Sequence, residues 1–376
     1  MKEIVLCSVW ILVIFSSIPF GNQIANAIVS FIAPPQITVL LLILVFIVAL
    51  GFIYWLRKSG YFGNTQKLIT GLVIILIYTY YFATLISMVE KLHFFEYGIL
   101  SLLLLRAISK KSSNGDIYFY VLFAVYMTGL ADETIQWLDP KRTGEYKDVL
   151  LNTGSGLLPL IACRHIFGYP KNVSHANLLP SLRRFLTICH IILIFTALFI
   201  DATNEFGYKH RVGRLTFYSR FTINELSIES EIHSDKYKKD LQSMSYVQSE
   251  NKYNDLYSRF NKREFPLMHE VSVHIARRER YLNPDRLDPY IAYSENEVLE
   301  EAYKGFIEGT SFYWSGDKKS SILGFEPSFS QTSPFISPVS KELITRFTRK
   351  TFWIIIFLVD VTINIIFFLI KKRDVR

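Results

Sequence analysis

The sequence predicts an all-α protein that crosses a membrane about eight times, with a mainly helical extracytoplasmic domain before its last helix. Half of the 376 residues are hydrophobic, and the mean hydropathy is +0.24. These residues are gathered in long runs, which is typical of membrane helices of about 20 residues. The alternation expected of a membrane β-strand is absent.

Eight segments are apolar over a length that spans, or nearly spans, the hydrocarbon layer. They are residues 4–20, 37–56, 68–87, 93–108, 117–130, 149–167, 185–200 and 352–370. The fourth and fifth are short, so they need their polar flanks, or burial against other helices, to reach both surfaces. The three cysteines lie in or beside these runs and are interpreted as small apolar side chains: Cys7, Cys163 and Cys189.

Basic residues in the short connections predict the orientation, because cytoplasmic loops are enriched in lysine and arginine. Fourteen lie on one side: Arg57, Lys58, Lys67, Arg106, Lys110, Lys111, Arg164, Lys171, Arg183, Arg184, Lys371, Lys372, Arg373 and Arg376. Four lie on the other: Lys91, Lys141, Arg142 and Lys147. We therefore expect a multi-pass protein of the cell membrane, with both termini cytoplasmic and residues 202–350 outside. Three residues disagree, although long loops follow the rule poorly: Arg346, Arg349 and Lys350.

The first apolar run is expected to remain as a membrane helix. The triplet ANA at residues 25–27 has the small-x-small form of a signal-peptidase site. The run before it is long for a signal peptide, however, and few basic residues precede that run. Cleavage would leave the orientation unchanged, because residue 27 would already lie outside.

The net charge of +8 comes largely from the cytoplasmic connections. It indicates contact with anionic lipid headgroups, so membrane lipids are the expected partners. There is no basic stripe interleaved with aromatic residues and no nucleic-acid motif, so nucleic acid is not an expected partner.

One connection, DETIQWLDPKRTGEYKDVLLN at residues 132–152, holds eight charged side chains between two apolar runs. Its polar residues have helical spacing at the end of one helix and the start of the next: Asp132, Glu133 and Gln136, then Asp148 and Asn152. A solvated loop would account for the charges, and Asp148 could simply cap a helix. Asn152 lies a turn deeper, where its amide needs partners.

A matching set lies one hairpin earlier, in EKLHFFEYGILSLLLLRA at residues 90–107. It places four polar side chains along a stripe that runs into the membrane: Glu90, His93, Glu96 and Tyr97. A charge at the bilayer centre costs about 2.5–3.5 kcal/mol, so such groups usually face one another inside a bundle. We expect them to meet the complementary side chains at one outer pocket: Arg142, Asp148, Gln136 and Asn152.

These two stretches resemble the VanZ-like membrane protein family. Its pattern is His-x-x-x-Tyr, then Asp/Glu-Glu-x-x-Gln, an arginine, and Asp-x-x-x-Asn before glycines. Here those positions are His93, Tyr97, Asp132, Glu133, Gln136, Arg142, Asp148 and Asn152. The resemblance covers about residues 68–168. Pro159 stands where the family tends to carry a small residue, which predicts looser helix packing there.

The resemblance implies a role at the cell envelope without naming a reaction. The family's founding member is associated with resistance to the glycopeptide antibiotic teicoplanin. A lipid-linked precursor or a glycopeptide is therefore a possible ligand, and no cofactor is expected.

Five regions follow from these observations. They are two N-terminal membrane helices (1–67), a VanZ-like core (68–170), a cytoplasmic loop with the seventh helix (171–201), an extracytoplasmic domain (202–350), and the last helix with its basic tail (351–376).

Within residues 202–350 the 22 basic and 21 acidic residues nearly cancel, and the length suffices for a small domain. Ser294 and Glu297 have the spacing of a capping box, which predicts a helix that starts there. Residues 253–282 also read as mainly helical, with a break near Pro266. Residues 328–340 are rich in serine and proline and predict a linker.

Two further stretches of this domain raise ligand hypotheses. In HEVSVH the histidines His269 and His274 are five apart, whereas a zinc-binding helix needs a separation of four, so no metal site is expected. The stretch RRER, Arg277–Arg280, is interpreted as a solvated face rather than a phosphate clamp.

Three functions remain open from the sequence. The protein is a binder or transporter of an amphiphile, an enzyme that uses His93 and the carboxylates on a lipid-linked substrate, or a structural protein whose polar groups only lock helices. The enzyme reading lacks a recognised nucleophile motif: Ser155 lies in TGSGL, which is no G-x-S-x-G elbow.

Overall fold

The computed structural model describes residues 2–20, 23, 27, 30–32, 34–61, 63–84, 88–111, 114–139, 144–170, 182–242, 256, 259–260, 262, 264–283, 287–324 and 333–374. The chain divides into two compact units. Unit 1 comprises residues 1–203 and 362–376, and unit 2 comprises residues 204–361.

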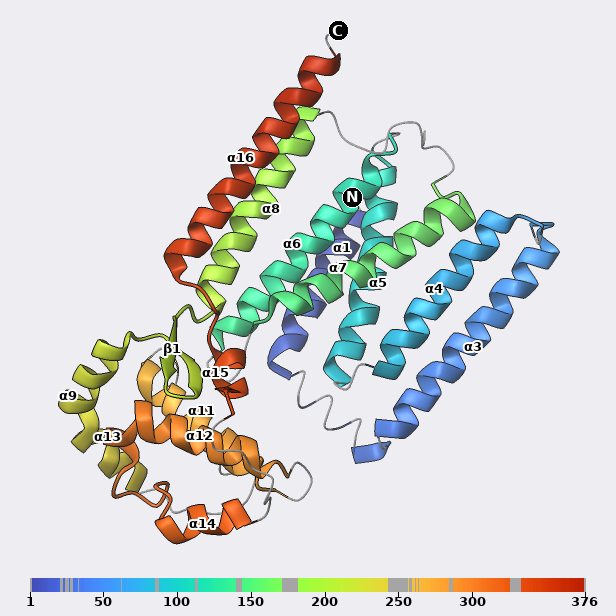
Figure 1. Ribbon diagram of the computed structural model, residues 1–376. Helices are drawn as coiled ribbons and strands as arrows, with labels where there is room; N and C mark the ends of the chain where they lie inside the picture. The colour runs from blue at the N-terminus through green and yellow to red at the C-terminus, as the bar shows by residue number, and fades with distance from the viewer. Residues whose placement is uncertain are drawn as a thin grey trace. The chain divides into compact units, whose positions relative to one another are not determined.

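Unit 1 consists of long helices (Figure 1). They are α1 (Lys2–Ser17) with the 3-10 turn η1 (Ile18–Phe20), α3 (Pro34–Lys58), α4 (Thr65–Thr84), α5 (Met88–Ser109), α6 (Ile117–Leu138), α7 (Tyr146–Ala162) with the π-turn η2 (Cys163–Phe167), α8 (Leu182–Thr203), and the end of α16 (Arg349–Asp374). The helical fold class is therefore confirmed. Helices α5 and α6 are longer than the fourth and fifth predicted apolar segments, because the polar flanks of those segments are also helical.

Six helices among the described residues are long and apolar enough to cross a membrane: α1 with η1, α3, α4, α5, α8 and α16. The predicted set of eight also contains α6 and α7. The acidic end of α6 lowers its hydropathy, and α7 has 17 residues, fewer than the roughly 20 that a span needs.

The centre of unit 1 is the contact of α5 with α6 and α7, and glycines allow these helices to approach closely. A Cβ atom on Gly156 would lie 2.8 Å from Val125 and 3.4 Å from the Tyr97 carbonyl oxygen. A Cβ on Gly98 would lie 3.7 Å from the Pro159 ring. The looser packing expected at Pro159 is thus wrong, because α5 presents a glycine to the proline.

The first helix belongs to the same core. Ile14 of α1 is fully buried in a cluster with Tyr97, Leu100 and Val121. The Trp10 indole also donates to the Glu96 carbonyl oxygen of α5 at 2.9 Å. On other faces, α4 packs its aromatic residues on Phe94 of α5, and α8 packs on α6.

Unit 2 contains a small sheet that the sequence analysis did not anticipate. Strand β1 (Tyr208–Val212) pairs antiparallel with β2 (Leu215–Ser219), and β2 pairs parallel with β3 (Phe335–Ile336). Gly213 has φ +56° at the first position of the two-residue turn, as a type II′ hairpin requires. The signal was a glycine between YKHRV and LTFYS, of which the second is rich in β-branched and aromatic residues.

The rest of unit 2 is helical: α9 (Ile223–Gln242), α11 (Pro266–Arg280), α12 (Pro289–Ala302), α13 (Lys304–Ile307), α14 (Gly316–Gly324), α15 (Pro338–Leu343) and the start of α16. Its core joins the sheet to α11, α12 and α13 through Phe217, Met268, Val271, Leu299 and Phe306. The unit therefore has a hydrophobic core of its own.

Two local predictions in unit 2 are wrong. Ser294 does not cap a helix, because α12 begins earlier at Pro289, where Asp288 accepts a hydrogen bond from the Ile291 N–H. Proline at the first helical position fixes that start. The predicted linker is also partly ordered: β3 and α15 lie in it, whereas residues 328–332 lie outside the described residues.

Candidate functional site

The first part of the candidate site lies in the first turns of α5. His93, Glu96 and Tyr97 share one face of this helix because they are three and four residues apart. His93 Nδ1 lies 3.1 Å from Glu96 Oε2. The side chains of His93 and Glu96 are 12% and 21% exposed, whereas Tyr97 is fully buried, so the stripe leads from a partly open end into the bundle.

The last two turns of α6 supply the second part. The Tyr97 hydroxyl donates to Asp132 Oδ2 at 2.8 Å, and His93 Nδ1 lies 3.9 Å from the same oxygen. The amide of Gln136 donates to Asp132 Oδ1 at 3.3 Å and to Glu133 Oε1 at 2.9 Å. Both carboxylates are buried, so the two adjacent acids form one hydrogen-bonded group with α5.

The start of α7 contributes a backbone donor. The Glu145 N–H donates to Glu133 Oε2 at 3.0 Å. Gly144 makes this possible, because a Cβ atom there would lie 2.4 Å from the Glu133 carbonyl oxygen. A helix N-terminus carries partial positive charge, which favours a carboxylate at this position.

Asn152, on the second turn of α7, completes the group. Its side chain is buried against α5 and α6: a Cβ on Gly129 would lie 3.8 Å from Asn152 Nδ2 and 3.8 Å from the Tyr97 ring. Among the described residues, neither its amide oxygen nor its amide nitrogen has a hydrogen-bond partner. Buried amides are normally paired, so this one is unusual.

Seven of the nine side chains proposed from the sequence therefore lie in one group. We name it the α5–α7 cluster: His93, Glu96, Tyr97, Asp132, Glu133, Gln136 and Asn152. Asp148 lies in the first turn of α7 and is half-buried. Arg142 and the side chain of Glu90 lie outside the described residues.

Sequence reasoning missed two contributors to this cluster, the Glu145 N–H and the close approach of Gly144. A backbone group carries no signature in the sequence. A glycine directly before a helix is a weak signal, because turns use glycine for many reasons.

The charges of the cluster are unbalanced. It contains three carboxylates and one imidazole, and the His93 imidazole contacts two of the carboxylates, Glu96 and Asp132. The N-termini of α5 and α7 each add roughly half a positive charge, and the C-terminus of α6 adds roughly half a negative one. The site is therefore rich in hydrogen-bond acceptors, and its imidazole and carboxylates are groups that could also transfer protons.

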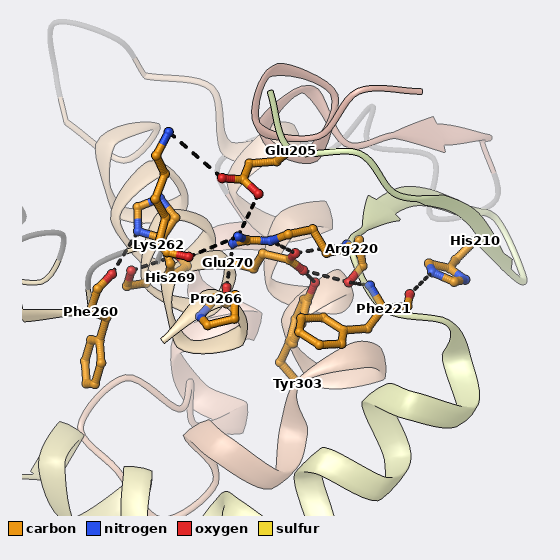
Figure 2. Close-up of polar contacts among 12 residues, drawn as sticks. Glu205, His210, Arg220, Phe221, Phe260, Lys262, Pro266, His269, Glu270 and Tyr303 are labelled. Atoms are coloured by element: carbon orange, nitrogen blue, oxygen red, sulfur yellow. Dashed lines mark hydrogen bonds and ion pairs between the residues drawn. The ribbon is translucent and has the colours of Figure 1, made fainter. Parts of the chain in front are cut away.

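Unit 2 has its own buried polar group, centred on Glu270 of α11 (Figure 2). This carboxylate accepts hydrogen bonds from the Ser219 hydroxyl at 2.7 Å, the Tyr303 hydroxyl at 2.9 Å, and the backbone N–H and Nε of Arg220 at 3.0 and 2.9 Å. Arg220 in turn reaches Glu205 at 2.9 Å. Glu270 is saturated by protein donors, so this group ties the sheet to α11 and is not a ligand site.

The RRER stretch is not a solvated face. Arg278 is fully buried: it stacks over Trp314 at 4.5 Å from the ring centroid and pairs with the adjacent Glu279 at 2.7 Å. Trp314 also donates to Glu279 at 2.9 Å. The pairing explains how these charges can be buried beneath α14.

The two histidines of HEVSVH point to different partners. His269 Nδ1 lies 2.9 Å from the Phe260 carbonyl oxygen, and His274 Nδ1 lies 2.8 Å from the buried carboxylate of Glu295. Within the described part of the chain, no three histidine, cysteine or acidic side chains are grouped as metal ligands would be.

A comparison with protein families supports the resemblance. Residues 4–167 match the VanZ/LLP1 family model. The matched segment begins earlier than the segment recognised in the sequence analysis, about residues 68–168, which left the first two helices outside the family's part of the chain. The burial of α1 against α5 and α6 gives the physical reason, because the core would be incomplete without α1. No curated protein and no solved structure matches the chain.

Proposed function

We propose that this VanZ-like membrane protein binds or handles an amphiphile at the outer face of the cell membrane, with the headgroup at the α5–α7 cluster. One observation carries the proposal: three carboxylates and an imidazole share a site at the ends of three helices, open only at His93 and Glu96. Such groups are costly in a membrane, and they usually mark a substrate or ion path.

The location suits a molecule with a polar head and an apolar tail. The cluster lies in the first turns of α5 and α7 and the last turns of α6, at one end of each helix. A headgroup resides at that depth of a bilayer, while its tails lie beside the apolar helices. A lipid, a lipid-linked cell-wall precursor and a lipoglycopeptide antibiotic all have this form, which would link the protein to envelope stress or glycopeptide resistance.

The test is mass spectrometry of amphiphiles that co-purify with the full-length protein in mild detergent. Glu133→Gln, Arg142→Ala and Asp148→Asn are compared with the unchanged protein and with Thr153→Ala. Thr153 neighbours Asn152 on α7 but bonds only to its own helix, at the Val149 carbonyl. We expect normal abundance with loss of the bound amphiphile in the three variants, and retention in the control. Collapse of abundance in all three would favour a purely structural role.

One observation favours an enzyme as the second candidate. The His93 imidazole lies 3.1 Å from Glu96 and 3.9 Å from Asp132 and is partly exposed, as a general base oriented by a carboxylate would be. Lipid and precursor profiles of a deletion strain separate the two readings. An accumulating precursor that the wild-type gene removes, and His93→Gln does not, supports catalysis; an unchanged profile supports binding.

A further inference from the structure

We propose that the amphiphile bound at the α5–α7 cluster carries a protonated primary amine. The carboxylates of this cluster and the amide oxygen of Asn152 would accept its N–H groups. This inference rests on the proposed function and specifies its ligand.

The charge of the α5–α7 cluster favours a cationic ligand. Three buried or partly buried carboxylates face one imidazole among the described residues, and the helix ends offset only a fraction of a charge. With His93 protonated and all three carboxylates ionised, these seven side chains carry a net negative charge. A buried negative site is stabilised by a cation and destabilised by an anion, so an ammonium group suits the described carboxylates better than a phosphate or carboxylate group does.

The hydrogen-bonding capacity of the cluster favours a ligand group that only donates. A carboxylate accepts about four hydrogen bonds and donates none when ionised, while an ammonium group donates three and accepts none. Asp132 receives bonds from Tyr97 and Gln136, and Glu133 receives bonds from Gln136 and the Glu145 N–H. Lone pairs therefore remain on both acids for a donor-only group.

The buried amide of Asn152 supports a bound ligand independently of the carboxylates. The Asn152 side chain is 1% exposed, and neither of its amide atoms has a hydrogen-bond partner among the described residues. It packs at Gly129 of α6, which lies one helical turn before Asp132 and Glu133. A buried polar group without a hydrogen-bond partner is unfavourable, so an isolated Asn152 amide would lower the stability of unit 1. A donor that bonds its amide oxygen removes part of that cost, so we place Asn152 at the headgroup site.

Access is possible from the end of α5. Glu96 and His93 are the partly exposed members of the cluster, and Glu96 would be the first carboxylate to meet an incoming amine. Glu96 lies in the half of α5 nearer its N-terminus, and the rest of the helix is largely apolar, so an alkyl chain attached to the amine could lie beside that apolar part.

The experiment measures thermal unfolding of the full-length purified protein in detergent, with three probes of equal chain length. They are octylammonium, octyltrimethylammonium, which has no N–H donor, and octyl phosphate, which is an anion. We expect octylammonium to raise the Tm with an apparent Kd about tenfold or more below that of the trimethyl compound, because hydrogen bonds to charged groups are strong. Octyl phosphate is expected to have no stabilising effect.

Variants at Asn152 test whether its amide oxygen contributes to the affinity for octylammonium. Asn152→Asp keeps an acceptor and adds charge, so it should bind octylammonium at least as tightly as the unchanged protein. Asn152→Leu should lose about tenfold in affinity. Thr153→Ala is the matched control and should bind normally. If Asn152→Leu does not fold, the ratio of the two alkylammonium affinities in the unchanged protein still decides the proposal.

Equal response to both alkylammonium probes, preference for octyl phosphate, or the same stabilisation by sodium chloride would overturn the amine assignment. If an amphiphile co-purifies but shows no amine preference, only this inference fails; if no amphiphile binds in any arm, the proposed function fails as well. The source is then identified in nanodiscs. Preference for phosphatidylethanolamine over phosphatidylcholine indicates a phospholipid, and preference for an alkyl glucosaminide over its N-acetyl form indicates an aminosugar.

Discussion

The Tyr97 hydroxyl of α5 donates to the Asp132 carboxylate of α6 at 2.8 Å, and both side chains are fully buried. The two residues are 35 positions apart, so this bond connects two helices rather than two turns of one. It also fixes the buried end of the α5–α7 cluster, while His93 and Glu96 form the end that is partly exposed.

Tyr97→Phe should therefore destabilise unit 1. The substitution removes the hydroxyl donor and leaves a buried Asp132 oxygen with one partner fewer, which costs about 1–3 kcal/mol. Thermal unfolding in detergent measures the effect. Tyr54→Phe is the control, because Tyr54 is 66% exposed on α3 and should leave the Tm unchanged. A Tm for Tyr97→Phe equal to that of the control would contradict the prediction.

Two glycines of α7 should respond oppositely to alanine. A Cβ on Gly156 would meet Val125 at 2.8 Å, so Gly156→Ala must push α6 away and lower the Tm. Gly154 has no atom within 4 Å of such a Cβ, and alanine is favoured over glycine inside a helix by about 0.8–1.0 kcal/mol. We expect Gly154→Ala to be neutral or stabilising. The same sign for both variants would be inconsistent with this packing.

In unit 2, Glu270→Ala should strongly destabilise the fold. It removes the acceptor of four hydrogen bonds and leaves Arg220 partly buried with one carboxylate partner fewer, which costs about 3–5 kcal/mol. Glu342→Ala is the matched control: its side chain is 68% exposed and pairs with Arg277 at 3.7 Å, so the loss should be below about 1 kcal/mol. Resistance of unit 2 to limited proteolysis distinguishes the two outcomes.

Unit 2 should lose stability in mildly acidic solution through His269. Burial, helped by the charges of Arg220 and Lys262, lowers the pKa of His269, although its bond to the Phe260 carbonyl acts in the opposite direction. The unfolded chain takes up the proton near its ordinary pKa of about 6.5, before the folded chain does. Stability is therefore complete above that pH and falls as the pH drops from about 6.5 toward the lowered folded pKa.

Hydrogen exchange of α11 in the full-length protein, corrected for intrinsic rates, measures this effect between pH 7.5 and 5.5. His269→Asn should flatten the pH dependence. His233→Asn should not, because His233 is 43% exposed on α9. A steep dependence that survives His269→Asn would assign the effect to another group.

The orientation can be tested with single cysteines in a background without Cys7, Cys163 and Cys189. We expect Lys58→Cys to be labelled only from the cytoplasm and Ser320→Cys only from outside, since both positions are exposed. A reporter fused after Arg376 should report cytoplasm. Labelling of both cysteines from the same side would reject the predicted topology, and with it an outer site.

Several features could be derived from the sequence because they depend on local pattern. Apolar runs gave the long helices, and the break expected near Pro266 lies where α11 begins. The spacing of His93 and Tyr97, and of Glu133 and Gln136, placed each pair on one helix face. Local pattern failed where two signals competed, as at Ser294, where Asp288 followed by proline defines the helix start.

The sequence by itself determined which segments of unit 1 are helical, and it selected polar residues whose burial in lipid would be costly. Only the tertiary structure decided which of them meet, because contacts between helices depend on close approach through Gly129, Gly144 and Gly156. The same holds for Glu270 and Arg220, which lie 50 residues apart and are joined by the packing of a sheet on a helix. Helices form from bonds within one segment, whereas a site is made by side chains whose distance in the chain carries no information about their distance in space.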